Sequence, residues 1–213
     1  MMRRTAILLA FSGTIAGGVV IDRVAVIVGR HAIKLSDIDR DLRVTEFLNR
    51  EPLNLSSDAR HKAADRLIDQ FIIGEEIASA ALARPIGSDA DTLLKQLQQD
   101  RFGGSAPRLR QALSAYGFTE DRLREQLLWQ LEVLRFIDQR FRPEVMVSDE
   151  EVRVYYNQHR SDLERQYPQT ASFEALEPKI RSSLEGERIN QNFVQWLQRA
   201  RQRNRIEIRQ GAF

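Results

Sequence analysis

The sequence contains no cysteine. This absence excludes disulfide bonds, thiol catalysis and thiolate metal sites. Histidine is scarce as well, and His31, His61 and His159 show no His-x-x-x-His spacing and have no carboxylate pair beside them to complete a ligand set. We therefore expect no metal site and interpret the three histidines as ordinary surface residues.

The sequence also lacks the common catalytic and nucleotide-binding motifs. It has no Gly-x-Ser-x-Gly, no Walker loop and no dinucleotide fingerprint. The glycines of Phe102-Gly103-Gly104-Ser105 do not follow a predicted strand, which favours a linker over a phosphate-binding loop. The acidic run Asp149-Glu150-Glu151 is explained by helix capping. The sequence thus predicts no catalytic residue and no cofactor.

Positive and negative charges are nearly balanced in the sequence. The chain has 32 lysine and arginine residues against 30 aspartate and glutamate residues, and Arg3 and Arg4 account for the surplus. Most basic residues are arginines, which we attribute to composition rather than to phosphate binding. No basic stripe is visible, so we expect no nucleic-acid partner.

The N-terminus has the pattern of a secretory signal over residues 1–18. Arg3 and Arg4 precede an apolar run that starts with Ala6–Phe11, and small residues then allow cleavage after Ala16 or after Gly18. An uncleaved anchor is the alternative, although the run barely reaches the length needed to span a bilayer. We expect a periplasmic or otherwise extracytoplasmic protein without stable membrane insertion.

The patterning predicts a mainly α fold with one small sheet. Val24–Val28 reads as a strand that is apolar on both faces, followed by a turn at Gly29-Arg30, a second short strand and a helix capped by Ser36. A buried strand needs a partner, and Ile206–Ile208 can supply one. The two ends of the chain would then meet in one sheet.

Apolar residues at three- and four-residue steps predict the remaining helices. They are expected at Ser57–Arg84, from Ser88 to just before Phe102, around Pro107–Leu113 with Gly117 as the C-cap, at Thr119–Phe141, from Ser148 through His159, and from about Pro178 to Arg203. Trp196 should pack in the core under the sheet. In the Thr119 helix the apolar stripe is Leu123, Leu127, Leu131, Leu134 and Phe141. Trp129, Val133 and Phe136 lie off it, so this helix is either central or open to a partner on one side.

Three segments resemble the SurA/PrsA class of extracytoplasmic folding factors. Residues 20–42 are similar to the opening of its mature chains, with Gly29 where that class often has Asn. The Tyr116-Gly117-Phe118 turn and the following Thr-Glu-Asp helix start resemble the later part of the SurA-type N-terminal chaperone domain. The Ser148-Asp-Glu-Glu-Val-x-x-Tyr-Tyr stretch resembles the helix that leads into a parvulin prolyl isomerase domain.

The resemblance resumes at Phe173–Pro178 and continues through the Trp196 helix to the Ile206–Ile208 strand, so it covers about residues 19–213. Residues 164–172 leave no room for an isomerase domain of roughly a hundred residues. The resemblance therefore implies a SurA N-terminal-like chaperone module without the parvulin domain. Residues 19–146 would form its helical N-domain with the β-hairpin, and residues 147–213 would complete it.

The expected function is that of an ATP-independent chaperone that binds unfolded or nascent secreted or outer-membrane polypeptides through apolar surface. Apolar residues in predicted loops and turns are the candidate contacts: Leu53, Leu55, Phe102, Tyr116, Phe118 and Met146. We expect no enzyme activity. Two alternatives stay open, a divergent peptidyl-prolyl isomerase and a non-catalytic scaffold that forms a homodimer.

Overall fold

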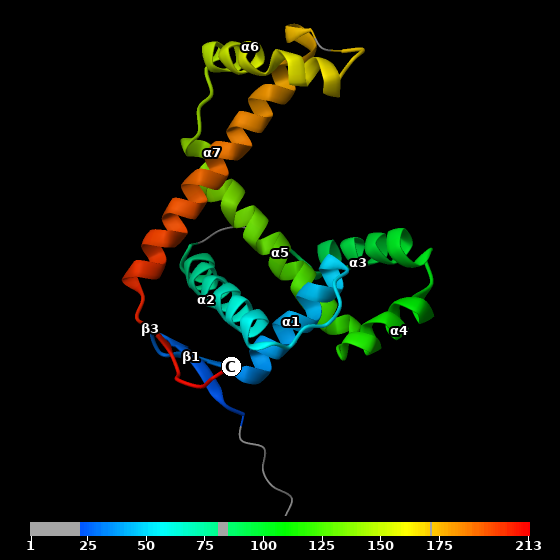
Figure 1. Ribbon diagram of the computed structural model, residues 1–213, viewed down its shortest axis with the longest axis vertical. Helices are drawn as coiled ribbons and strands as arrows, with labels where there is room; N and C mark the ends of the chain where they lie inside the picture. The colour runs from blue at the N-terminus through cyan, green and yellow to red at the C-terminus, as the bar shows by residue number, and fades with distance from the viewer. Residues whose placement is uncertain (1–21, 81–84, 171) are drawn as a thin grey trace, which may run out of the picture.

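A computed structural model describes residues 22–80, 85–170 and 172–213. The described chain is mainly helical, with one antiparallel sheet near the lower end of the molecule in Figure 1. Its elements are β1 (Val24–Val28), β2 (His31–Lys34), α1 (Leu35–Asn49), α2 (Ser57–Ser79), α3 (Gly87–Phe102), α4 (Ala106–Tyr116), α5 (Glu120–Phe141), a 3₁₀ turn (Arg142–Glu144), α6 (Asp149–Gln166), α7 (Phe173–Arg203) and β3 (Ile206–Ile208). The predicted signal peptide lies outside the described residues.

The sheet joins the two ends of the described chain, as predicted. Its strand order is β2-β1-β3, and both pairings are antiparallel. Val26 pairs with Ile208 and Val28 with Ile206. The central strand β1 pairs along both edges and packs against α2, and Val26 and Val28 have no exposed surface. Gly29 makes the hairpin turn with φ of 60°, a conformation that glycine adopts at little cost.

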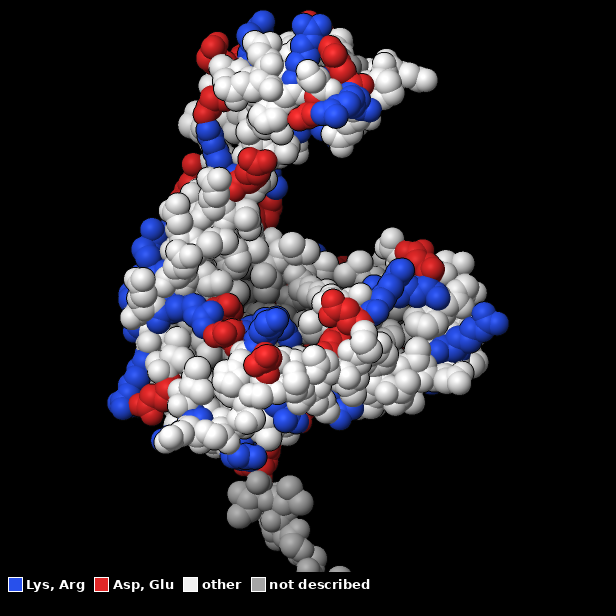
Figure 2. Space-filling model, viewed as in Figure 1, with Lys and Arg blue, Asp and Glu red and all other residues white. Residues whose placement is uncertain are grey.

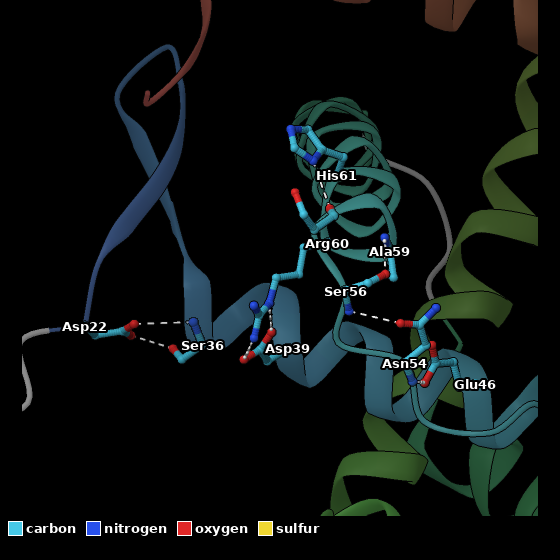
Figure 3. A network of polar contacts seen from close by, with 10 residues as sticks. Asp22, Ser36, Asp39, Glu46, Asn54, Ser56, Ala59, Arg60 and His61 are labelled. Carbon is cyan, nitrogen blue, oxygen red and sulfur yellow. Dashed lines mark hydrogen bonds and ion pairs between the residues drawn. The ribbon is translucent and has the colours of Figure 1, made fainter. Parts of the chain in front are cut away.

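The cap of α1 differs from the prediction. Lys34, not Ser36, is the N-cap residue, and its backbone N–H donates to the carboxylate of Asp37 at 3.0 Å. Ser36 lies in the first turn, where its hydroxyl and backbone N–H both donate to Asp22 (Figure 3). These hydrogen bonds lower the pKa of Asp22. The serine therefore ties the base of the hairpin to the helix.

Ion pairs and hydrogen bonds fix α1 against α2. Arg60 donates to Asp39 at 2.8 and 3.1 Å, and the N–H of Asn54 donates to Glu46 at 2.7 Å (Figure 3). Asp41 is buried on the same face of α1 and is paired with Arg66 at 2.6 Å. Buried carboxylates need such partners, so these contacts fix the register of the two helices.

The described residues form three apolar cores. The first lies between the sheet, α2, the C-terminal half of α5 and the C-terminal half of α7. The second joins the end of α1 to α3, α4 and the start of α5, and the third joins α6 to the start of α7. Trp196 is 8% exposed and lies in the first core, as predicted. Helix α7, about 46 Å long, connects the first core to the third (Figure 1).

Helix α5 is central, which decides between the two alternatives for its second apolar side. Phe136 is buried, and Trp129 and Val133 pack against the first core. The prediction that Leu134 is part of the buried stripe is wrong, because this side chain is 62% exposed. Leu134 lies about 10 Å beyond Leu127 along the helix axis, past the end of the second core.

Two helix boundaries also differ from the prediction. Helix α2 ends at Ser79, with Ala80 in extended conformation as its C-cap, and the rest of the predicted helix, residues 81–84, lies outside the described residues. Helix α7 begins at Phe173 rather than Pro178, which is inside the helix. Ser172 caps it by accepting from the N–H of Ala175 at 3.3 Å. The extra turn buries Leu176 against α6, which offsets the backbone hydrogen bond that Pro178 cannot donate.

Gly117 and Gly186 give a matched test of backbone conformation. Gly117 ends α4 with φ of 73°, so Gly117→Ala should lower the free energy of unfolding by about 1–2 kcal/mol. Gly186 lies within α7, and a Cβ atom there would meet nothing within 4 Å. Gly186→Ala should therefore stabilise the protein by about 0.5–1 kcal/mol. Urea unfolding of both variants measures the two changes, and equal signs would contradict the assigned conformations.

A pH-dependent contact holds α6 on α7. Glu151 accepts hydrogen bonds from Arg188 and from Ser148, and these lower its pKa to about 2. A lowered pKa means that this stabilisation is complete above pH 4.5, the ordinary value for this carboxyl, and is lost as the pH falls toward about 2. The protection factors of the α6 amides, which are exchange rates corrected for their intrinsic pH dependence, should therefore fall in this acidic range. In Glu151→Gln the fall should be smaller, and an unchanged pH profile of the protection factors would contradict the assignment.

Candidate polypeptide-binding site

The structure brings together three of the six residues that the sequence singled out. Phe102 ends α3, Tyr116 ends α4, and Phe118 follows the Gly117 turn; all three pack against the second core. The other three are dispersed. Leu55 packs against the first core, Leu53 is 36% exposed in the α1–α2 loop, and Met146 is 84% exposed between α5 and α6.

Phe47 of α1 is the centre of the aromatic group. Its ring lies 5.4 Å from that of Phe118 and 5.6 Å from that of Tyr116, both edge to face, and 6.4 Å from that of Phe102, nearly parallel. Phe47 is buried and the other three rings are partly buried. We call Phe47, Phe102, Tyr116 and Phe118 the aromatic cluster. The exposed parts of its three outer rings offer apolar surface, and the second core holds these rings in place.

A pocket of about 390 Å³ opens into this cluster. It is lined by Phe47, Arg50, Asp100, Arg101, Phe102 and Tyr116. The aromatic rings form its apolar part, and the charged side chains belong to the ends of α1 and α3. Such a combination of apolar walls with a few polar groups is typical of small binding sites.

Side chains from α3 and α4 fix the end of α1 at this pocket. The Arg101 guanidinium donates to the carbonyl oxygens of Phe47 at 3.2 Å and Leu48 at 2.9 Å, and the Tyr116 hydroxyl donates to that of Glu51 at 2.7 Å. These contacts hold carbonyl groups of the last turn of α1 and of the loop that follows it. Arg50 is the C-cap of α1, with φ of 63°. The pocket wall is therefore built from a helix terminus held by its neighbours.

The charge at the pocket is mainly positive. Arg50 and Arg101 face a single carboxylate, that of Asp100. Burial, and then the positive charge of Arg50, lower the pKa of Arg101. A ligand carboxylate or carbonyl oxygen would relieve this repulsion. The pocket thus suits a polypeptide segment with an apolar side chain next to a hydrogen-bond acceptor.

The molecule is hollowed beside these elements. In Figure 2 the lobe of α6 and the start of α7 overhangs an open hollow, and in Figure 1 α5 borders this hollow on the lower left and α3 lies below it. Arg135 pairs with Asp89 at 2.8 Å, which brings the start of α3 to the middle of α5. Ile86 and Leu134, 65% and 62% exposed, lie on these two stretches. The sequence signal for Ile86 was its apolar side chain in the Pro85-Ile86-Gly87 loop.

Each histidine lies against an aromatic ring. His31 stacks on Phe71 at 4.5 Å, and His159 stacks on Tyr155 at 4.1 Å. His61 lies 4.1 Å from the ring of Phe213. Within residues 22–80, 85–170 and 172–213, no group of three or more acidic or histidine side chains is placed to hold a metal ion.

Comparison with known proteins shows a distant similarity to a foldase. No family model matches the chain. The chain is similar to the foldase protein PrsA of two strains of Clostridium kluyveri, with 24% identity over 153 residues in each case. The match covers 63% of this chain and 45% of the relative, so the chain spans less than half of the relatives' length. This similarity supports a distant relationship with PrsA-like foldases.

The described helices carry no segment that is both long and apolar enough to cross a membrane.

Proposed function

We propose that this protein is an extracytoplasmic, ATP-independent chaperone for unfolded secreted or outer-membrane polypeptides. The observation that carries the proposal is the aromatic cluster, in which three partly exposed rings and a pocket of about 390 Å³ are held on a rigid helix end. The distant similarity to PrsA supports it. The location outside the cytoplasm rests on the signal pattern of residues 1–18.

The geometry suits weak and reversible capture. Apolar surface contributes about 25 cal/mol per Å² when it is buried, so a few hundred Å² gives several kcal/mol before the cost of ordering the client. The hollow beside α5 leaves room for a polypeptide segment (Figure 2). A client held this loosely can be released without ATP.

The proposal does not include prolyl isomerisation. Helix α6 ends at Gln166 and α7 begins at Phe173, and the residues between them are too few for a parvulin domain. A proline-limited peptide isomerisation assay tests this part. A rate well above background would favour the divergent isomerase instead. The homodimer stays a prediction, which light scattering can examine.

The aromatic cluster gives the functional prediction. Phe102→Ala should raise the concentration needed for half-maximal suppression of client aggregation roughly fivefold, because an aromatic contact is worth about 1 kcal/mol. The control is Val154→Ala, since Val154 is 41% exposed on α6, away from the cluster. Light scattering of a chemically denatured client after dilution measures both. Failure of the natural chain to suppress aggregation at several-fold molar excess would overturn the proposed function, and equal effects of the two variants would exclude the cluster as its site.

A further inference from the structure

A second groove runs along the free edge of the hairpin. A pocket of about 370 Å³ is lined by residues of β2, by Leu67, Gln70 and Phe71 of α2, and by Trp129 of α5. A larger pocket of about 670 Å³ follows at the hairpin turn, between the second half of α2 and the end of α7. The two pockets share His31 and Phe71, whose rings are stacked. The two pockets adjoin at this ring pair, and we call them together the β2 groove.

The free edge of β2 faces this groove. In the strand order β2-β1-β3, β2 has a partner on one side only. Val28 and His31 flank the two-residue turn as a pair, and the next pair is Ile27 with Ala32. The pair next to such a turn exchanges its hydrogen bonds across the hairpin, so the backbone N–H and C=O of Ala32 point outward. Ala32 is exposed and lines the smaller pocket.

The groove has the length and the walls for an extended chain. From Leu67 to Ser79, the α2 residues that line it span about 18 Å, which corresponds to about five residues of a strand. The floor of the smaller pocket is apolar, with Leu67, Phe71 and Trp129. A strand added to β2 would alternate its side chains, with every second one directed to this floor.

Polar groups at the groove favour an occupant with an acidic residue. Arg40 pairs with Asp37 at 2.7 Å, and Lys34 ends the strand. Arg122 pairs with Glu125 at 2.8 Å, but its Nε is buried without a hydrogen-bond partner among the described residues. A carboxylate in the bound segment would accept from this Nε and add to the basic lining of the smaller pocket. A second copy of β2 would instead place its own Arg30, His31 and Lys34 against the same basic residues, which disfavours edge-to-edge pairing of two chains.

We propose that the β2 groove binds an extended polypeptide segment by strand addition to Ala32, with an apolar or aromatic side chain in the Leu67–Trp129 pocket and an adjacent acidic residue facing Arg40 and Arg122. The inference rests on the proposed chaperone function and names a second client site for it. The segment would exchange two backbone hydrogen bonds with Ala32. Binding would therefore depend on backbone groups and tolerate many sequences.

Fluorescence anisotropy with the full chain tests the proposal. The probe is a labelled eight-residue peptide of alternating threonine and valine, with a central phenylalanine followed by glutamate. Ala32→Pro removes the outward N–H without removing a bond to β1, and should weaken binding about tenfold or more. Val154→Ala alters an exposed residue of α6 outside the groove and should bind the peptide within about twofold of the natural chain. Equal binding by the two variants would overturn the proposal.

Peptide chemistry gives a test that does not depend on the folding of a variant. Two further probes are N-methylated versions of the same peptide. One carries the methyl groups on the amides along one edge of the extended peptide, and the other carries them on the amides along the opposite edge. The natural chain should lose binding to one of them by about tenfold or more and retain the other. Equal binding of both would overturn strand addition. A dimer that Ala32→Pro dissociates in sedimentation would identify a second copy as the occupant and overturn the peptide assignment.

The aggregation assay separates this proposal from the proposed function. Suppression by the natural chain together with equal binding of both N-methylated probes would leave the chaperone function standing and overturn the β2 groove. Edge-selective peptide binding without any suppression would support the groove as a peptide site and overturn the chaperone function.

Discussion

Replacing Trp196 by alanine is expected to lower the free energy of unfolding by about 3–5 kcal/mol. The Trp196 ring is 8% exposed in the first core, and its centre lies 5.4 Å from that of Phe136 and 6.0 Å from that of Phe141. Truncation removes the apolar area and leaves a cavity between α5 and α7 that the surrounding rings fill only in part. Because a typical domain is stable by about 5–15 kcal/mol, this loss is a large share of the total. Urea unfolding followed by circular dichroism measures it.

Two variants in the same helix control for this result. Trp196→Phe keeps an aromatic ring in the site and should cost less than the alanine variant. Val194→Ala alters a residue that is 41% exposed and should change stability by no more than about 0.5 kcal/mol. A loss within about 0.5 kcal/mol for Trp196→Ala would show that α7 does not dock on the first core.

The pairing of the chain ends could be predicted because few other segments of the sequence could form a strand beside Val24–Val28. A strand that is apolar on both faces, such as Val24–Val28, must be covered on both sides and paired along its edges. The remaining chain was helical in pattern until Ile206–Ile208. The register of β1 against β3, in which Val26 pairs with Ile208, could not be predicted, since a strand of three residues can pair in more than one way.

The errors at helix ends came from competition that a local pattern does not reveal. Ser36 is a good capping residue, but its hydroxyl donates to Asp22 instead. The N-cap position is held by Lys34, whose backbone N–H donates to the carboxylate of Asp37. Pro178 reads as a first-turn residue, but burial of Leu176 against α6 extends the helix in front of it. In each case a tertiary contact outweighed a propensity of about 1 kcal/mol or less per residue.

The aromatic cluster was predicted in part. Phe102, Tyr116 and Phe118 drew attention because they flank glycine turns, where apolar side chains are uncommon. Phe47 was missed because inside a helix it reads as an ordinary core residue. Arg101 contacts the end of α1 at Phe47 and Leu48, which precede it in the sequence by 54 and 53 positions. No spacing in the sequence indicates a contact over such a distance.

Deleting residues 205–213 should destabilise the first core about as strongly as Trp196→Ala. The deletion removes β3 and leaves one edge of β1 without a partner. It also removes two backbone hydrogen bonds of 2.8 and 2.9 Å, from the N–H of Gly29 to the carbonyl of Arg205 and from the N–H of Arg209 to that of Ala25. Buried Ala212 and partly buried Phe213 are lost as well. Burial of these side chains and of Ile206 at about 1–3 kcal/mol for each large one predicts a cost of roughly 3–6 kcal/mol.

Ile208→Thr is the matched control, because Ile208 is 54% exposed and threonine keeps the β-branched shape of the strand. It should change stability by no more than about 0.5 kcal/mol. Hydrogen exchange locates the effect: in the deletion variant the amides of Ile27 and Gly29, which face β3, should lose protection, while those of α6 keep theirs because they belong to the third core. Unchanged protection in β1 would mean that the strand is held without its C-terminal partner, and the account of a sheet closed by the two chain ends would then fail.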